Sequence, residues 1–213
     1  MKRDRDNLIA GLADDLAPVR GFSARDGAVL VTLAVLATVL GVSFFQGLWA
    51  GILSGEAEPF FWITNGLLLL LGLASASAVV AMASPHVGAR HDAPNWAAAM
   101  VGILPVAAII SVIPHGHGPS ALMDPVSIHC LTSSLIASTV TGGALLYWLR
   151  RGAPVSLEKA GWFTGLAAGA LGGVAYGLSC PLTTVTHLGI WHVLPVAITA
   201  VIGRLAIPRL VNW

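Results

Sequence analysis

The sequence contains little charge. Asp, Glu, Lys and Arg together make up 10% of its 213 residues, against 56% hydrophobic residues, and the mean hydropathy is +0.81. Soluble globular domains carry roughly 25% charged residues. The composition therefore excludes a soluble domain and indicates an integral membrane protein.

Six hydrophobic segments are long enough to cross a hydrocarbon core of about 30 Å. The breaks between them are short and contain turn residues, so none holds a second domain. The 26 residues before the first segment are polar or amphipathic and do not resemble a cleaved signal peptide. We therefore expect an all-α membrane domain over residues 27–213 and a separate segment over residues 1–26. The predicted spans are Gly27–Phe45, Trp62–Ala83, Trp96–Ile113, Val126–Leu149, Ala160–Leu178 and Leu188–Ile207.

Positive charge is absent from one side of the predicted bundle. All eleven Lys and Arg residues lie in the N-terminal segment, in the breaks after the second and fourth spans, or at the end of the sixth span. The other side holds Glu56, Glu58 and Asp124. The positive-inside rule therefore predicts six spans with both termini in the cytoplasm. The spans also lack a central charged residue that would form an ion path, which disfavours a small metal transporter.

The sequence has only two cysteines, Cys130 and Cys180. One begins the fourth span and the other follows the fifth, so both lie on the predicted non-cytoplasmic side. Because these spans are antiparallel neighbours, we expect the two thiols to lie near each other. The absence of CxxC spacing disfavours a thiol-oxidising membrane enzyme. Three interpretations remain open, namely small apolar packing residues, a disulfide switch and a soft-metal site.

Five of the seven histidines lie on the same side as the cysteines. Two thiolates and two imidazoles complete a tetrahedral shell for a soft metal such as zinc. No HxxxH spacing occurs, so the ligands would converge from separate loops. The alternatives are a flexible polar loop and, for His192, a packed imidazole hydrogen-bonded to a helix. The candidate metal ligands are Cys130, Cys180, His115, His117, His129, His187 and His192.

Glycines recur at every fourth position of the fifth predicted span. Such a row of small residues lets another helix backbone approach closely. We expect it to form one tightly packed face. Its members are Gly161, Gly165, Gly169, Gly173 and Gly177.

The N-terminal segment contains an apolar stripe at helical spacing. Its residues fall within an arc of roughly 100°, which predicts a short amphipathic helix. Five Asp residues nearly cancel the basic charge of the segment, which weakens binding to anionic lipid and favours a protein partner. Both interpretations remain open. The stripe consists of Leu8, Ile9, Leu12, Leu16 and Val19.

Three stretches of the chain carry a family resemblance. They are the opening Asn-Leu-Ile-Ala-Gly-Leu-Ala-Asp-Asp-Leu-Ala-Pro-Val-Arg over residues 7–20, the turn Leu-Arg-Arg-Gly-Ala-Pro over 149–154, and Ser-Cys-Pro over 179–181 leading to Trp191 and His192. Together they resemble the NrsF family, the negative regulators of sigma F. The chain lacks the HxxxCxxC zinc signature of a different anti-sigma class.

This resemblance implies a six-span protein of the bacterial inner membrane with no enzymatic activity and no required cofactor. It implies that the cytoplasmic N-terminal region sequesters an extracytoplasmic-function sigma factor, without direct contact to nucleic acid. It also implies that the residues matching Cys130 and Cys180 perceive heavy-metal or oxidative stress.

Overall fold

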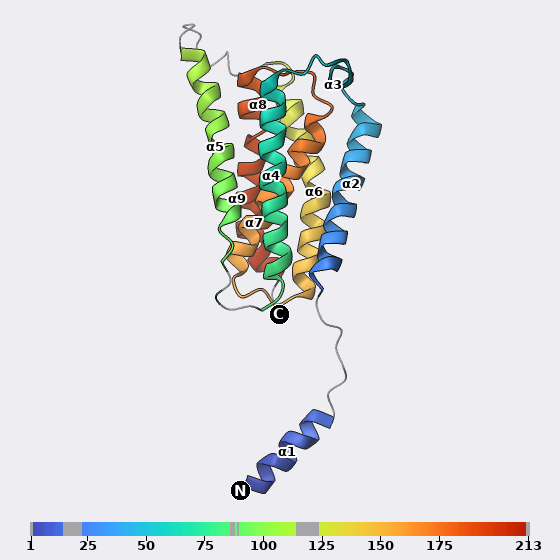
Figure 1. The fold of residues 1–213 in the computed structure, drawn as a ribbon, viewed down its shortest axis with the longest axis vertical. Helices are drawn as coiled ribbons and strands as arrows, with labels where there is room; N and C mark the ends of the chain where they lie inside the picture. Colours follow the sequence, from blue (N-terminus) through green and yellow to red (C-terminus); the bar gives the residue numbers. More distant parts are fainter. Residues whose placement is uncertain (1, 15–22, 86–87, 89, 114–123, 212–213) are drawn as a thin grey trace.

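The computed structural model describes residues 2–14, 23–85, 88, 90–113 and 124–211, with side chains from residue 5 onward. Within these ranges the chain forms helices and connecting turns and contains no strand, which confirms the all-α prediction. The long helices stand side by side in one bundle, and α1 lies apart from it (Figure 1). The helices are α1 (Lys2–Asp14), α2 (Ala24–Gln46), α3 (Gly51–Ser54), α4 (Pro59–Met82), α5 (Ala93–Val112), α6 (Ser127–Arg151), α7 (Leu157–Gly177), α8 (Val185–Trp191) and α9 (Leu194–Leu210).

Five candidate membrane spans are long and apolar enough to cross a bilayer, namely α2, α4, α5, α6 and the stretch that contains α8 and α9. Helix α7, the fifth predicted span, falls outside this set. It has a length of 21 residues, but its six glycines contribute no hydropathy, and 16 of its residues are buried by neighbouring helices. Helix α7 therefore meets protein on most sides, whereas α2 and α5 expose most of their surfaces.

The glycine row of α7 packs closely against other helices, but it does not form one face. A Cβ atom on Gly161 or Gly165 would collide with the backbone of α9, whereas a Cβ atom on Gly177 would collide with Asn65 of α4. Four residues advance a helix by about 400°, so a row with this spacing drifts by about 40° at each step. The prediction of a single face was wrong for this reason. The row winds from α9 toward α4.

The sixth predicted span is interrupted. Helix α8 ends at Trp191, and α9 begins at Leu194, with His192 and Val193 forming a turn between them. Pro195 lacks the N–H that would donate to the carbonyl group of Trp191, so the helical hydrogen-bond ladder fails at this point. The turn places His192 inside the bundle rather than on a regular helix face.

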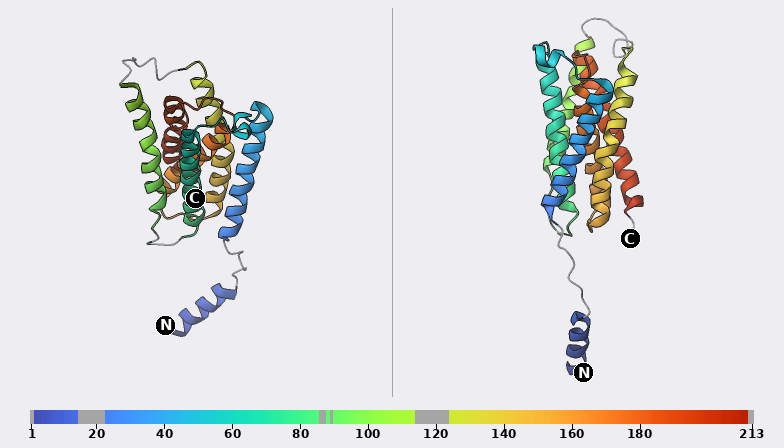
Figure 2. Two further views of the ribbon diagram at one scale, coloured as in Figure 1. Left: turned by 45° about the horizontal axis from the view of Figure 1, so that its top comes forward. Right: turned by 90° about the vertical axis from the view of Figure 1, so that its right-hand side faces the viewer.

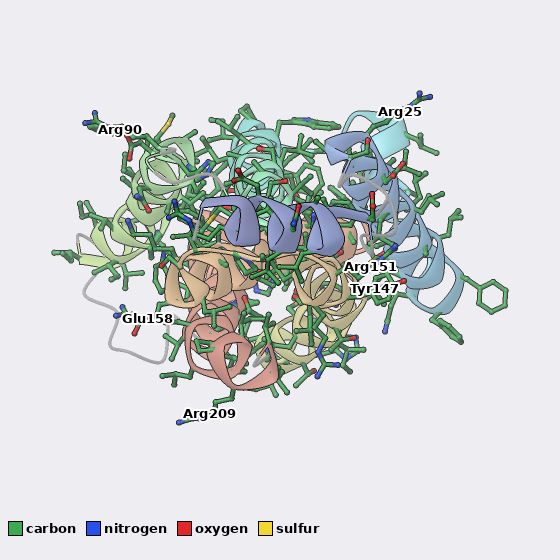
Figure 3. The ribbon with its side chains drawn as sticks, turned by 90° about the horizontal axis from the view of Figure 1, so that it is seen from below. Arg25, Arg90, Tyr147, Arg151, Glu158 and Arg209 are labelled. Carbon is green, nitrogen blue, oxygen red and sulfur yellow. The ribbon has the colours of Figure 1, made fainter. Side chains whose placement is uncertain are left out.

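The bundle has two ends of different character. Helix α2 begins and α9 ends at the end nearest α1, which we call the α1 end, and α3 and α8 lie at the opposite end, which we call the cysteine end (Figures 1 and 2). Arg25, Arg90, Arg151 and Arg209 point outward at the α1 end (Figure 3). The Lys and Arg residues that the structure describes all belong to α1 or to this end. The structure thus reproduces the charge asymmetry expected from the sequence.

Candidate functional site

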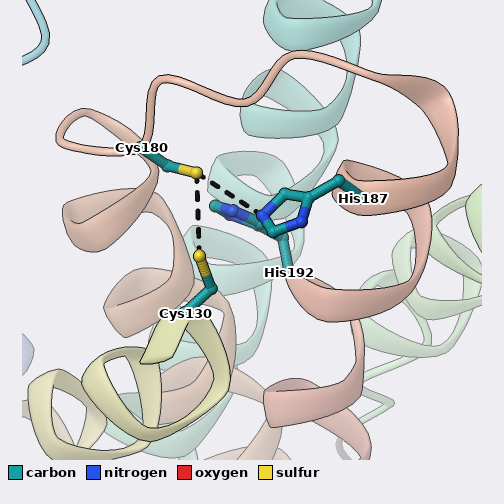
Figure 4. Close-up of side chains that lie close together, drawn as sticks. All are labelled: Cys130, Cys180, His187 and His192. Carbon is teal, nitrogen blue, oxygen red and sulfur yellow. Dashed lines mark hydrogen bonds between the residues drawn. The ribbon is translucent and has the colours of Figure 1, made fainter. Parts of the chain in front are cut away.

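Two cysteine thiols meet at the cysteine end of the bundle. Cys130 lies in the first turn of α6, and Cys180 follows α7. Their sulfur atoms are 3.7 Å apart, both side chains are fully buried, and both thiols are free (Figure 4). The short connection between α6 and α7 brings their outer ends together, as the hairpin argument predicts.

His187 joins the thiols from α8. The hydroxyl group of Thr184 accepts a hydrogen bond from the backbone N–H of His187, which fixes the start of α8 and the position of this residue. The His187 Nε2 atom lies 3.5 Å from Cys180 Sγ (Figure 4). The opposite ring nitrogen, Nδ1, donates to Asp124 Oδ2 at 2.6 Å. This contact leaves Nε2 as the atom that faces the sulfur.

Asp124 is itself held by the start of α6. Its Oδ1 accepts from the backbone N–H of Val126 at 2.9 Å, and its own N–H donates to Ser127 Oγ at 3.1 Å. Burial alone would raise the pKa of Asp124, but hydrogen bonds from His187, Ser127 and Val126 and the charge of His187 together lower it below its ordinary value. Asp124 is therefore an anionic acceptor directed at His187.

His192 completes the group from the turn between α8 and α9. Its side chain is fully buried, and neither ring nitrogen makes a hydrogen bond to another described residue. Its ring packs edge-on against that of His187, with the centroids 5.5 Å apart. A buried polar group without a partner costs on the order of 1–3 kcal/mol, so this imidazole indicates an interaction that the protein atoms do not supply.

The four side chains form a potential Cys2His2 metal site. One ligand atom from each of Cys130, Cys180, His187 and His192 lies within 4.8 Å of all the others. A tetrahedral zinc ion separates its two sulfur ligands by about 3.8 Å, and a sulfur from a nitrogen ligand by about 3.6 Å. The observed sulfur separation of 3.7 Å and the Cys180 to His187 distance of 3.5 Å agree with these values.

One of the predicted histidine ligands, His129, does not belong to this group, and two others cannot be placed. His129 is exposed and its Nε2 lies 3.4 Å from Gln46 Oε1 at the end of α2. Adjacent helical residues point about 100° apart, and His129 points away from the face of α6 that carries Cys130. His115 and His117 lie outside the described residues.

The two thiols contact each other, and Cys130 also contacts a tyrosine. Cys130 Sγ lies 3.6 Å from the hydroxyl oxygen of Tyr176 on α7. The hydrogen bond with Cys130 and burial both raise the pKa of the Cys180 thiol above its ordinary value.

Comparison with known proteins identifies the family. The family model described as "NrsF: Negative regulator of sigma F" matches residues 12–213. The chain belongs to the NrsF family. It is similar to the anti-sigma-F factor NrsF of Caulobacter vibrioides, with 31% identity over 98% of this chain and 99% of the relative. It is also similar to a probable anti-sigma-F factor NrsF of Azospira oryzae, with 28% identity over 73% of both chains. No solved structure matches the chain.

Membership of the NrsF family makes the protein a negative regulator of a sigma factor and not an enzyme. The second candidate region predicted from the sequence is α1. Leu8, Ile9 and Leu12 of the predicted stripe lie on α1 and are 62–64% exposed. Leu16 and Val19 lie outside the described residues.

Sequence reasoning missed two residues that contact the candidate ligands, Asp124 and Tyr176. Asp124 was noted only as an acidic residue on one side of the bundle. The run Asp-Pro-Val-Ser before α6 is a sign of a helix start, but its pairing with His187 spans 63 positions. No local pattern predicts a contact at that distance.

Proposed function

We propose that the protein is a six-span protein of the bacterial inner membrane with both termini in the cytoplasm. Helix α7 lies within the bundle beside the five apolar spans (Figure 1). All Lys and Arg residues that the structure describes belong to α1 or to the α1 end, which supports a cytoplasmic α1 end under the positive-inside rule. The cysteine cluster then lies at the periplasmic end.

Topology is measurable with two introduced cysteines in a background that lacks the native pair. Ser54→Cys lies at the cysteine end and Val155→Cys at the α1 end, and both positions are exposed. A membrane-impermeant maleimide applied to intact cells should label the first and not the second. The reverse pattern would exclude the proposed orientation.

The proposed activity is the sequestration of an extracytoplasmic-function sigma factor by the segment of residues 1–26. Leu8, Ile9 and Leu12 place apolar surface on a helix that lies apart from the bundle. An amphipathic helix of this kind binds an apolar groove of its partner. Mixed Asp, Lys and Arg charge in the segment favours this partner over a lipid surface.

The proposed signal is metal or oxidative stress, perceived by Cys130 and Cys180. The observation that carries this step is the convergence of both thiols with His187 and an unpartnered His192. A ligand that shifts the bundle from about 1:99 to 99:1 between two conformations must favour one by roughly 5.5 kcal/mol. Soft-metal capture supplies free energy on this scale, and so does thiol oxidation in an oxidising compartment.

A sigma-dependent reporter tests the whole proposal. Full-length protein should silence the reporter, and metal or oxidant should restore its activity. A variant with Cys130→Ser and Cys180→Ser should still silence the reporter but should not respond. A protein that captures no sigma factor from membranes would contradict the anti-sigma step, whereas a double variant that still responds would contradict only the sensing step.

A further inference from the structure

The cysteine cluster consists of Cys130, Cys180, His187 and His192. The carboxylate of Asp124 lies beside it and contacts one of its members. It lies in no helix and reaches His187 across 63 residues of sequence to make a contact of 2.6 Å. His187 is 1% exposed, whereas Asp124 is 31% exposed. The carboxylate thus stands between a buried imidazole and the surface.

Three observations point to a metal cation at this cluster in preference to a disulfide. Two separations, 3.7 Å between the sulfur atoms and 3.5 Å from Cys180 Sγ to His187 Nε2, agree with tetrahedral edges of about 3.8 and 3.6 Å around a zinc-sized ion. A disulfide would join the sulfur atoms and leave both nitrogens of His192 without partners. The cysteine end carries Glu56, Glu58 and Asp124 and no described Lys or Arg, so its charge favours a cation.

The burial of the cluster specifies the kind of metal site. Cys130, Cys180 and His192 are 0% exposed and His187 is 1% exposed. Four protein ligands with no open position characterise a structural or sensing site, since a catalytic zinc ion keeps one position for water. The mixed sulfur and nitrogen donors select soft or borderline ions that accept four-coordinate geometry.

We propose that Cys130, Cys180, His187 and His192 bind one thiophilic metal cation in a closed tetrahedral shell, and that Asp124 is the positioning residue that orients His187 toward it. This inference rests on the proposed sensing function and names its ligand class. The Asp124 carboxylate accepts the Nδ1 proton, so the lone pair of Nε2 is directed at the ion. Binding forms two metal–sulfur and two metal–nitrogen bonds. The thiol protons pass to solvent, and no oxidant is consumed.

The role of Asp124 has a structural consequence beyond affinity. Asp124 is fixed to the first turn of α6 through Val126 and Ser127, while His187 belongs to α8. Cys130 lies in that same first turn. Metal capture would therefore add a link from Cys130 on α6 through the ion to His187 on α8, beside the hydrogen bond between Asp124 and His187 that is already present.

Cobalt(II) is a suitable probe because its absorption spectrum reports both thiolate ligation and coordination geometry. Purified full-length protein in detergent, reduced beforehand, should bind one Co²⁺ with sulfur-to-metal charge-transfer bands and the intense visible bands of tetrahedral coordination. Zn²⁺ should displace it. Absence of these bands, or the weak bands of octahedral coordination, would overturn the assignment of the shell. Capture of the sigma factor by the same sample is measured separately and would survive that failure.

Variants at Asp124 separate positioning from ligation. Asp124→Ala should weaken Co²⁺ binding by about 10–100-fold and keep the tetrahedral thiolate spectrum, because the four ligands remain. Asp124→Asn retains an oxygen acceptor for Nδ1 and should lose less affinity. The matched control is Glu56→Gln, which removes the same charge from the same end without touching His187.

The outcomes at Asp124 are distinct. If Asp124→Ala binds Co²⁺ as tightly as Glu56→Gln does, the positioning role is wrong. If its spectrum loses the charge-transfer bands, Asp124 supports the thiols rather than the imidazole, which also overturns the proposal. Thermal unfolding of the metal-free proteins shows whether a lower affinity reflects a damaged fold.

Discussion

The cysteine end of the bundle and α1 differ in whether their candidate binding groups are buried together or exposed. At the cysteine end, four ligand atoms already converge within 4.8 Å and are fully or almost fully buried. On α1, by contrast, Leu8, Ile9 and Leu12 are exposed although they are apolar. Under the proposed function, an ion would bind the unpartnered His192 in the first region, whereas a macromolecular surface would cover the apolar side chains of the second.

This difference indicates a division of labour between the regions. A preformed site recognises a small ligand without a large ordering cost, because its side chains are already fixed. A helix that lies apart from the bundle adapts to the shape of its partner. Helix α7 contacts α2, α4, α6 and α9, so we propose it as the element that transmits a change at the cysteine end to the rest of the bundle.

Loss of both thiols should produce the largest effect. It should abolish the metal response and leave binding of the sigma factor by α1 intact. A structural zinc site contributes about 10 kcal/mol or more of binding free energy, so Cys130→Ser with Cys180→Ser should abolish metal binding. The sigma-dependent reporter should stay silent with or without metal. Thr132→Ser, at an exposed position in the next turn of α6, is the control. A double variant that retains metal-induced reporter activity would show that the thiols are not needed for the response.

Charged substitutions on α1 should produce the second largest effect. They should weaken capture of the sigma factor and leave metal binding unchanged. Leu8→Asp with Leu12→Asp should weaken sigma-factor capture by about 4 kcal/mol, roughly a thousandfold, since apolar anchors of an interface each contribute about 2 kcal/mol. Metal binding should be unchanged. Capture is measured by pull-down of the sigma factor with full-length protein.

Asp14→Asn provides the control for α1, because Asp14 lies on the face opposite to the stripe. It should capture the sigma factor normally. If this control loses capture as completely as the stripe variant, the partner recognises charge rather than the apolar face.

Much of this organisation could be predicted from the sequence because hydrophobic length and charge are local properties. The start of the second span was predicted at Trp62 but lies at Pro59, because proline is well tolerated in the first turn of a helix. The row of glycines was visible, but its drift around α7 was not anticipated. The sixth span was predicted as one continuous segment, yet the chain breaks before Pro195, where α8 ends and His192 turns inward.

The site was predictable only as a set of candidates. The predicted topology placed seven candidate ligands at the same end of the bundle. They were Cys130, Cys180, His187 and His192, together with three other histidines. Which imidazoles converge depends on side-chain direction, and this is set by helix phase for His129 and by the turn after α8 for His192. The contact between Asp124 and His187 depends on the packing of α6 and α8 and has no sequence signature.

The close packing of α7 should be more sensitive than the lipid-facing surface of the bundle. A Cβ atom on Gly165 would meet the backbone of Thr199 and Ala200, which cannot rotate away. Gly165→Ala should therefore lower the free energy of unfolding by about 2–3 kcal/mol. Gly143→Ala on α6 is the matched control, because nothing lies within 4 Å of its added Cβ. Equal thermal unfolding of the two variants would show that α7 has room to move.

The exposed ion pair at the α1 end should matter least. Glu158 Oε2 lies 3.5 Å from Arg204 Nη2, and both side chains are more than half exposed. Pairs of this kind contribute about 0–1 kcal/mol and are screened by salt. Glu158→Gln should therefore shift the unfolding temperature by no more than about 2 °C, and the shift should vanish at high ionic strength. A loss as large as that of Gly165→Ala would mean that Glu158 and Arg204 hold α7 to α9 at the α1 end. The α1 end would then resemble the cysteine end in holding its polar side chains in fixed positions.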